Sequence, residues 1–147
     1  MLDFSSLDDE DFPLRIDWDW AGAEAEFRRA LALKPGYARA HETYALFLAI
    51  QRRFAEAMAE MQRAGQLDPL SASVNNGIGR ILHFQGRYEE ALHQFQKTLA
   101  LEPGYAETWF SIGMTRLAQH RYDDAIAALQ TDRKSTRLNS SHSGESR

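Results

Sequence analysis

The chain has 147 residues, of which 44% are hydrophobic and none is cysteine, so the composition allows a packed core but excludes a disulfide framework and a thiolate metal site. The formal net charge is −4, and residues 21–131 carry 12 acidic and 12 basic side chains, which excludes a broad basic surface for nucleic acid. No run approaches the roughly 18 apolar residues of a membrane-spanning helix, and we therefore expect a cytoplasmic chain without a membrane partner.

The first 17 residues are acidic and poorly suited to a helix. Residues 1–20 hold seven acidic side chains against Arg15 alone, and Pro13 in a helix interior would cost about 3 kcal/mol. Such charge runs are usually solvated, so we expect residues 1–17 to form an irregular segment. Two other interpretations stay open, an acidic docking tail and a set of apolar side chains that covers the first helix: Phe4, Leu7, Phe12, Leu14 and Ile16.

Three prolines lie 34 residues apart, at Pro35, Pro69 and Pro103. Each follows an apolar helical pattern, and proline fits just past a helix end because it lacks an N–H and its ring clashes with the preceding turn. A fixed period of this length indicates one structural unit copied along the chain. The period predicts four units. Residues 18–37 form a half unit with a second helix only, residues 38–71 and 72–105 form two full units, and residues 106–131 form a truncated unit.

Small residues recur at two places in each unit, where they let paired helices approach closely. The eighth place holds Ala45, Gly79 and Gly113, and the twentieth holds Ala57, Ala91 and Ala125. The twenty-fourth place holds large apolar residues, which we expect to interdigitate with the small ones: Phe27, Met61, Phe95 and Leu129. Gly86 marks the turn between two helices, and the predicted equivalents in the other units are Arg52 and Arg121.

This pattern resembles the tetratricopeptide repeat, a helix–turn–helix unit of 34 residues, over about residues 18–131. The resemblance implies an all-α fold, an α-solenoid of antiparallel helix pairs wound into a right-handed superhelix of about 3.5 repeats. The chain departs from the family at the fourth place, where tryptophan is favoured and His41 and Asn75 are found. We expect weaker packing contacts at both positions.

The phrase at residues 17–24, Asp-Trp-Asp-Trp-Ala-Gly-Ala-Glu, adds a narrower resemblance. It is similar to the repeat regions of some bacterial signalling proteins, among them winged-helix transcriptional regulators and serine/threonine kinases. This resemblance implies that the array is part of a larger parent, and a parent with membrane parts stays open.

From Asp132 the sequence no longer follows the repeat, because a proline is due at position 137 and Arg137 is found there. Residues 132–142 resemble the in-frame translation of a common sequencing adapter. We therefore expect residues 132–147 to be a non-native tail. The alternative is a genuine serine-rich basic tail that binds phosphate or is phosphorylated.

The common catalytic and metal-binding patterns are not matched. The five histidines do not show the two-histidine helix spacing of zinc proteases, and no carboxylates are spaced to complete a metal site with His83 and His93. Gly77-Ile78-Gly79 lies inside a predicted helix and lacks the Lys-Ser/Thr pair of a phosphate loop. The sequence therefore predicts no enzyme activity, no metal and no cofactor.

The family resemblance implies where a partner would bind, because the first helices of these repeats line a concave face. The residues that it places in a partner-binding groove are Arg39, Glu42, Leu46, Ile50, Asn76, Arg80, His83, Phe84, Phe110 and Met114. The family's carboxylate clamp for chaperone tails is not matched, because other residues occupy its places: Glu42, Leu46, Glu107 and Ser111.

The function favoured by these observations is a protein–protein interaction scaffold that presents the groove to a peptide or partner helix. One alternative is the sensor or regulatory region of a larger bacterial transcriptional regulator or protein kinase. Another is that the groove side chains pack on neighbouring protein or are simply exposed.

Truncated ends of a repeat array leave apolar faces without polar caps, so weak self-association is also expected. The side chains that we expect to be unpaired are Trp20, Phe27 and Leu31 at one end and Ile126 and Leu129 at the other.

Overall fold

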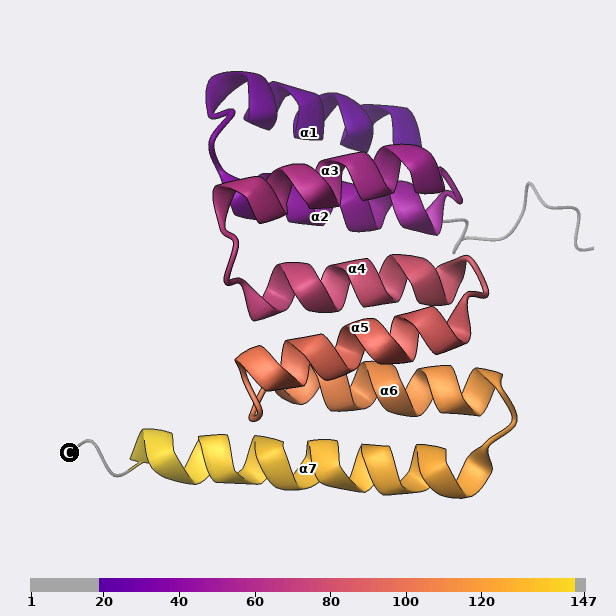
Figure 1. Cartoon of the computed structure of the whole chain (residues 1–147). Coiled ribbons are helices and arrows are strands. Elements are labelled where there is room, and N and C mark those ends of the chain that lie inside the picture. Colours follow the sequence, from indigo (N-terminus) through magenta and orange to yellow (C-terminus); the bar gives the residue numbers. More distant parts are fainter. Residues whose placement is uncertain (1–18, 145–147) are drawn as a thin grey trace, which may run out of the picture.

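Seven helices stack in chain order into one array (Figure 1), and residues 19–144 contain no strand. The structure is a computed structural model that describes the backbone of residues 19–144 and the side chains of residues 19–134 and 137, so the irregular segment predicted at residues 1–17 lies outside the described residues. The helices are α1 (Trp20–Leu33), α2 (Ala38–Ile50), α3 (Phe54–Leu67), α4 (Ala72–Phe84), α5 (Tyr88–Leu101), α6 (Ala106–Ala118) and α7 (Tyr122–Gly144). The predicted all-α solenoid of helix pairs is confirmed.

The contacts between helices explain how the array curves. The closest pairs are α2 with α3, α4 with α5 and α6 with α7. The first helices of successive units also lie close together, α2 with α4 and α4 with α6, whereas in the described residues the backbones of α1, α3, α5 and α7 stay farther from one another, with no Cα atoms within 8 Å. The first helices are therefore crowded together on the inner, concave side, and the second helices are spread along the outer side.

The 34-residue period reappears in the helix boundaries. α2, α4 and α6 begin at Ala38, Ala72 and Ala106, and α3, α5 and α7 begin at equally spaced residues. The prolines stand two residues after α1, α3 and α5 end, where a residue without an N–H breaks no helical hydrogen bond.

The turn between the two helices of each unit has one left-handed residue. These residues are Arg52, Gly86 and His120, with φ angles of 63°, 77° and 61°. In each turn the following N–H bonds back to a carbonyl five residues earlier, as Arg87 N does to Leu82 O at 2.9 Å, which satisfies a carbonyl at the helix end. The prediction that Arg121 is the equivalent of Gly86 is wrong, because the left-handed backbone occurs one residue earlier, at His120.

The core of each unit is built from a small residue facing a large one. A Cβ atom added at Gly79 would lie 2.3 Å from Cε1 of Phe95, and one added at Gly113 would lie 2.7 Å from Cδ2 of Leu129. Ala57 and Ala91 are fully buried between the paired helices. Because glycine at this place of the first helix has no side chain, the large residue of the second helix can fill the space between the two helices.

The two departures from tryptophan at the fourth place are compensated by hydrogen bonds. His41 is buried, with Nδ1 2.6 Å from a Glu60 oxygen and Nε2 2.8 Å from the Pro35 carbonyl oxygen. Asn75 donates to the Ser71 carbonyl and accepts from Gln94. His41 therefore links the connection before α2 to α3. Asn75 links the start of α4 to α5.

Within the described residues no helix of the same unit precedes α1, and α1 packs on α2. The ring of Phe27 lies 5.5 Å from that of Tyr44 and 5.1 Å from that of Phe47, measured between centroids. The expectation that Phe27 and Leu31 are unpaired is wrong, because both pack against the core cluster around α2. At the other end Leu129 packs against α6, and Ile126 is the exposed residue, with 54% of its surface accessible. Self-association stays a prediction.

A network of charged groups also fixes α1 to the next unit. Glu24 on α1 accepts a hydrogen bond from the guanidinium of Arg53, just before α3, at 2.8 Å. It accepts another from the Tyr44 hydroxyl on α2, also at 2.8 Å. Arg53 also pairs with Glu56. The hydrogen bonds from Arg53, and after them the one from Tyr44, lower the pKa of Glu24 from its ordinary 4.5 to about 2.

We expect this network to make the attachment of α1 sensitive to acid. The pKa of Glu24 is lower in the folded chain than in the unfolded one, so its contribution is complete above pH 4.5 and is lost as the pH falls toward about 2. Glu24→Gln should be less stable than the unmodified chain at neutral pH, and the difference should vanish near the low end of this window. Urea unfolding followed by circular dichroism at several pH values measures the difference.

Glu26→Gln provides the control, because Glu26 lies exposed on the same helix. We expect it to change stability little at any pH. A Glu24→Gln effect of the same size at neutral pH and at acid pH would contradict the assignment to this ion pair.

α7 continues without interruption past Thr131 as far as Gly144. The predicted boundary between residues 131 and 132 is therefore a change of sequence pattern that the backbone does not mark, and the non-native origin of residues 132–147 stays a prediction. Over residues 19–144, no helix combines the length and the apolar character that crossing a membrane would require.

Candidate functional site

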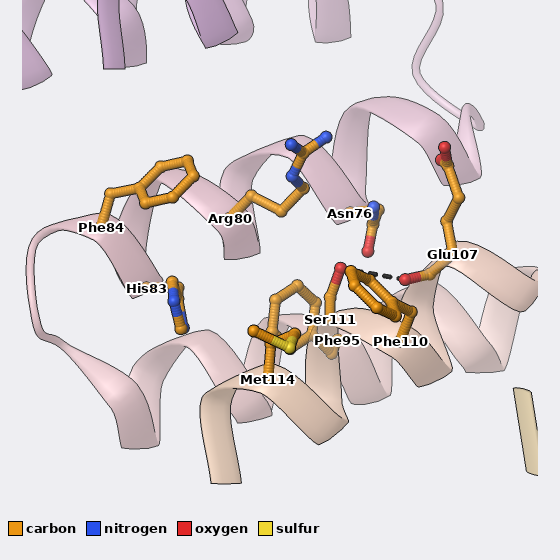
Figure 2. A pocket seen from close by; sticks show the side chains of 9 residues that line it. All are labelled: Asn76, Arg80, His83, Phe84, Phe95, Glu107, Phe110, Ser111 and Met114. Carbon is orange, nitrogen blue, oxygen red and sulfur yellow. Dashed lines mark hydrogen bonds between the residues drawn. The ribbon is translucent and has the colours of Figure 1, made fainter. Parts of the chain in front are cut away.

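A cavity of about 310 Å³ lies on the concave side between α4 and α6. Four of its lining residues belong to α4, four belong to α6, and Phe95 comes from α5; Figure 2 shows their side chains around the hollow. The residues that line it are Asn76, Arg80, His83, Phe84, Phe95, Glu107, Phe110, Ser111 and Met114.

The cavity exists because of the 34-residue repeat. Asn76 and Phe110 occupy the same place in successive units, as do Arg80 and Met114. Since α4 and α6 begin 34 residues apart and lie in contact, equivalent residues face the same space from two sides. Phe95 reaches this space because Gly79 on α4 has no side chain to block its ring.

The apolar part of the cavity is formed by Phe84, Phe110 and Met114, which are 39%, 52% and 38% exposed. Phe95 is fully buried and forms the inner wall. Exposed large apolar side chains cost free energy in water unless another surface covers them. Their concentration around one hollow distinguishes this part of the surface from the isolated exposed leucines at the helix ends.

Asn76 is held at the inner end of the cavity by a buried hydrogen bond. Its Oδ1 accepts from the hydroxyl of Thr108 on α6 at 3.1 Å, and only 2% of the residue is exposed. Its amide nitrogen has no acceptor among the residues whose side chains are described. An Asn side chain carries two N–H donors, so this nitrogen is available to a ligand in the cavity.

His83 is fixed by Thr115, whose hydroxyl lies 2.9 Å from Nδ1. The same hydroxyl donates to the Ser111 carbonyl at 2.8 Å, so Nδ1 must be the donor toward Thr115 and must carry a hydrogen. Burial, and secondly the positive charge of Arg80, lower the pKa of His83, which favours the neutral ring. In that neutral form Nε2 is an acceptor.

Arg80 and Glu107 are the cation and the anion of the cavity lining. Glu107 accepts a hydrogen bond from the hydroxyl of Tyr105 at 2.7 Å. Arg80 is half-buried, yet it makes no ion pair or hydrogen bond with any residue that the structure describes. Its five N–H donors are therefore free to bind a ligand.

Six of the ten groove residues predicted from the sequence line this cavity: Asn76, Arg80, His83, Phe84, Phe110 and Met114. The other four, from α2, do not line it: Arg39, Glu42, Leu46 and Ile50. Glu42 accepts a hydrogen bond from the Ser73 hydroxyl instead, while Arg39 and Ile50 are exposed and Leu46 is half-buried.

The structure adds Phe95, Glu107 and Ser111 to the lining. Phe95 lies on a second helix, whereas the family rule places ligand contacts on the first helices only. The sequence held one signal for it, the glycine at position 79 opposite a large residue at the twenty-fourth place. Among the side chains that the structure describes, no three histidine and carboxylate groups are placed to hold a metal ion.

The stacked helix pairs with a hollowed concave side define an α-solenoid scaffold. The sequence matches two family models, both described as Tetratricopeptide repeat, over residues 19–72 and 70–131. The chain belongs to the tetratricopeptide repeat family. A comparison with curated proteins found no match.

Solved structures of MamA are similar to this chain. A crystal structure of MamA has a TM-score of 0.63 and 18% identity, covering 83% of this chain and 71% of that one. The MamA RS-1 ArsTM double mutant has a TM-score of 0.63 and 17% identity, and the match covers 84% of this chain and 70% of that one. The structure of MamA MSR-1 has a TM-score of 0.60 and 16% identity, and the match covers 82% of this chain and 69% of that one. At these identities the likeness shows the fold alone. Proteins built from these repeats generally act as scaffolds for protein interaction, and this chain is a scaffold in that general sense.

Proposed function

We propose that the cavity between α4 and α6 is the partner-binding site of this scaffold and that it takes a peptide segment of another protein. The observation that carries the proposal is the group of exposed apolar side chains around one hollow, Phe84, Phe110 and Met114. The hollow is near the lower end of the usual volume range of small-ligand pockets, about 300–1,000 Å³, and suits one or two large side chains of a peptide.

The rigidity of the site favours peptide binding. The cavity walls are side chains on packed helices, and Asn76, His83 and Phe95 are each held by a hydrogen bond or by complete burial. A preformed site loses little conformational entropy when it binds, so more of the contact energy appears as affinity. Burial of Phe110 by a partner would also remove apolar surface from water.

Peptides selected from a random display library on the purified chain test this proposal. Phe110→Ala and Met114→Ala should each weaken the selected peptides about tenfold or more, as expected for large anchors near the centre of an interface. Fluorescence anisotropy with labelled peptide measures the dissociation constants, and circular dichroism verifies that each variant is folded.

Leu70→Ala is the matched control. Leu70 is also large, apolar and exposed, but it lies in the connection between α3 and α4 and does not line the cavity. We expect it to leave the affinity unchanged. Equal effects of Leu70→Ala and Phe110→Ala, or no effect of either groove variant, would contradict the proposal.

A further inference from the structure

We propose that the partner segment, on the basis of the function proposed above, carries an acidic side chain between two large apolar ones, and that Arg80 and Asn76 bind its carboxylate. The carboxylate would enter the cavity beside His83, while the flanking apolar side chains would lie along the first helices on either side of α4. Four features of the structure support this ligand class.

The first feature is the free charge of Arg80. A guanidinium in a half-buried position usually has an anionic partner, yet Arg80 has neither an ion pair nor a hydrogen bond with any residue whose side chain is described. A carboxylate matches the planar donor pattern of arginine with two parallel hydrogen bonds. The partial burial of the site strengthens such a pair relative to one in open water.

The second feature is the buried amide of Asn76. Only 2% of the residue is exposed, and the Thr108 hydroxyl donates a hydrogen bond to its Oδ1. Its unpartnered nitrogen lies one helical turn before Arg80 on the same face of α4. Two donor groups, one charged and one neutral, therefore converge on one cavity, as a site for a single carboxylate requires.

The third feature is the order of residues across the units. The ninth place reads Leu46 on α2, Arg80 on α4 and Met114 on α6. Because α2, α4 and α6 contact one another in this order, a segment that crosses all three meets an apolar, then a cationic, then an apolar side chain. The complementary segment has an acid between two apolar residues.

The fourth feature is the small net charge of the cavity. Arg80 contributes one positive charge and Glu107 one negative charge, with His83 favoured in its neutral form. A singly charged carboxylate can bind on the Arg80 side, whereas the doubly charged phosphate of a phosphopeptide would meet one cation and one anion. We therefore assign the site to a carboxylate.

The test compares matched peptides on matched variants of the full chain. A peptide selected on the chain is made in an acidic form and with each Asp or Glu replaced by Asn or Gln. One such replacement should weaken binding at least tenfold. On Arg80→Gln the two forms should bind equally, and on Glu107→Gln the acidic form should bind several-fold more tightly while the amide form is unchanged. Arg29→Gln, exposed on α1, should leave both forms unaffected.

The outcomes separate this inference from the proposed function. If Phe110→Ala weakens both peptide forms but no acid-to-amide change matters, only the carboxylate assignment is overturned. The same holds if the preference for the acid survives in Arg80→Gln. If Phe110→Ala affects neither form, or no peptide can be selected, both the assignment and the proposed function are overturned. Tighter binding of a phosphorylated form than of its acidic counterpart would transfer the site to phosphopeptides and overturn the assignment.

Discussion

Phe95→Ala should lower the free energy of unfolding by about 3–5 kcal/mol, the range observed when a buried Phe is truncated to Ala. Phe95 is fully buried, belongs to the core cluster that joins α4 to α7 and packs into the gap left by Gly79. Its ring packs on α4 and borders the cavity between α4 and α6, so the surrounding helices can close the space only partly after truncation. Urea unfolding followed by far-ultraviolet circular dichroism measures the loss.

Phe84→Ala is the control for this effect. Phe84 has the same side chain and borders the same cavity, but it remains 39% exposed at the end of α4. Its removal should cost much less than that of Phe95 because less apolar surface is lost from the folded state. Equal losses for the two variants would show that Phe95 does not occupy the core position described here.

Gly79→Ala should destabilise the chain by up to about 2 kcal/mol even though alanine favours helices. The exchange of Gly for Ala inside a helix gains about 1 kcal/mol, but the new Cβ would lie 2.3 Å from a ring carbon of the buried Phe95. Overpacking of a core costs typically 1–3 kcal/mol, sometimes more, and a buried aromatic ring cannot turn aside as a flexible side chain can. Thermal and urea unfolding measure the sign of the change.

Gly65→Ala provides a comparison with the opposite expected sign. A Cβ at Gly65, inside α3, would meet only Cγ1 of Val74 at an ordinary contact distance of 3.5 Å. This variant should therefore show the helix gain of about 1 kcal/mol without a clash. A stabilising Gly79→Ala would contradict the close approach of α4 and α5.

The helices could be predicted from the sequence because one period repeats four times. Three prolines and the small residues at fixed places were enough to give the units, and the family matches support them. The turn at His120 was missed because a left-handed histidine carries no glycine-like signal. The packing of Phe27 was missed because the direction of a helix face depends on the elements around it, and the backbone of α1 approaches only that of α2 closely within the described residues.

The candidate site was only partly predictable. The family rule indicates which places of the first helices face inward, and this gave Asn76, Arg80 and Phe110 together. It could not indicate that the α2 residues lie outside the cavity, since that depends on how the units curve. Nor could it indicate that Arg80 lacks a partner, whereas Arg53 finds Glu24 across 29 residues of sequence.

The role of the array in a larger regulator or kinase stays a prediction. Nothing in the cavity favours a regulatory function over a free scaffold, because the same side chains would bind a peptide in either case. The prediction that residues 132–147 are non-native likewise depends on the sequence alone.

The central claim, that the cavity between α4 and α6 binds the partner, is tested most directly with the methionines as probes. Met114 lines the cavity, while Met61 is fully buried and Met58 packs against the core clusters. In a chain with ¹³C-labelled methionine methyl groups, titration with a selected peptide should shift the Met114 signal and leave those of Met58 and Met61 in place. Saturation of binding with an unmoved Met114 signal would contradict the claim.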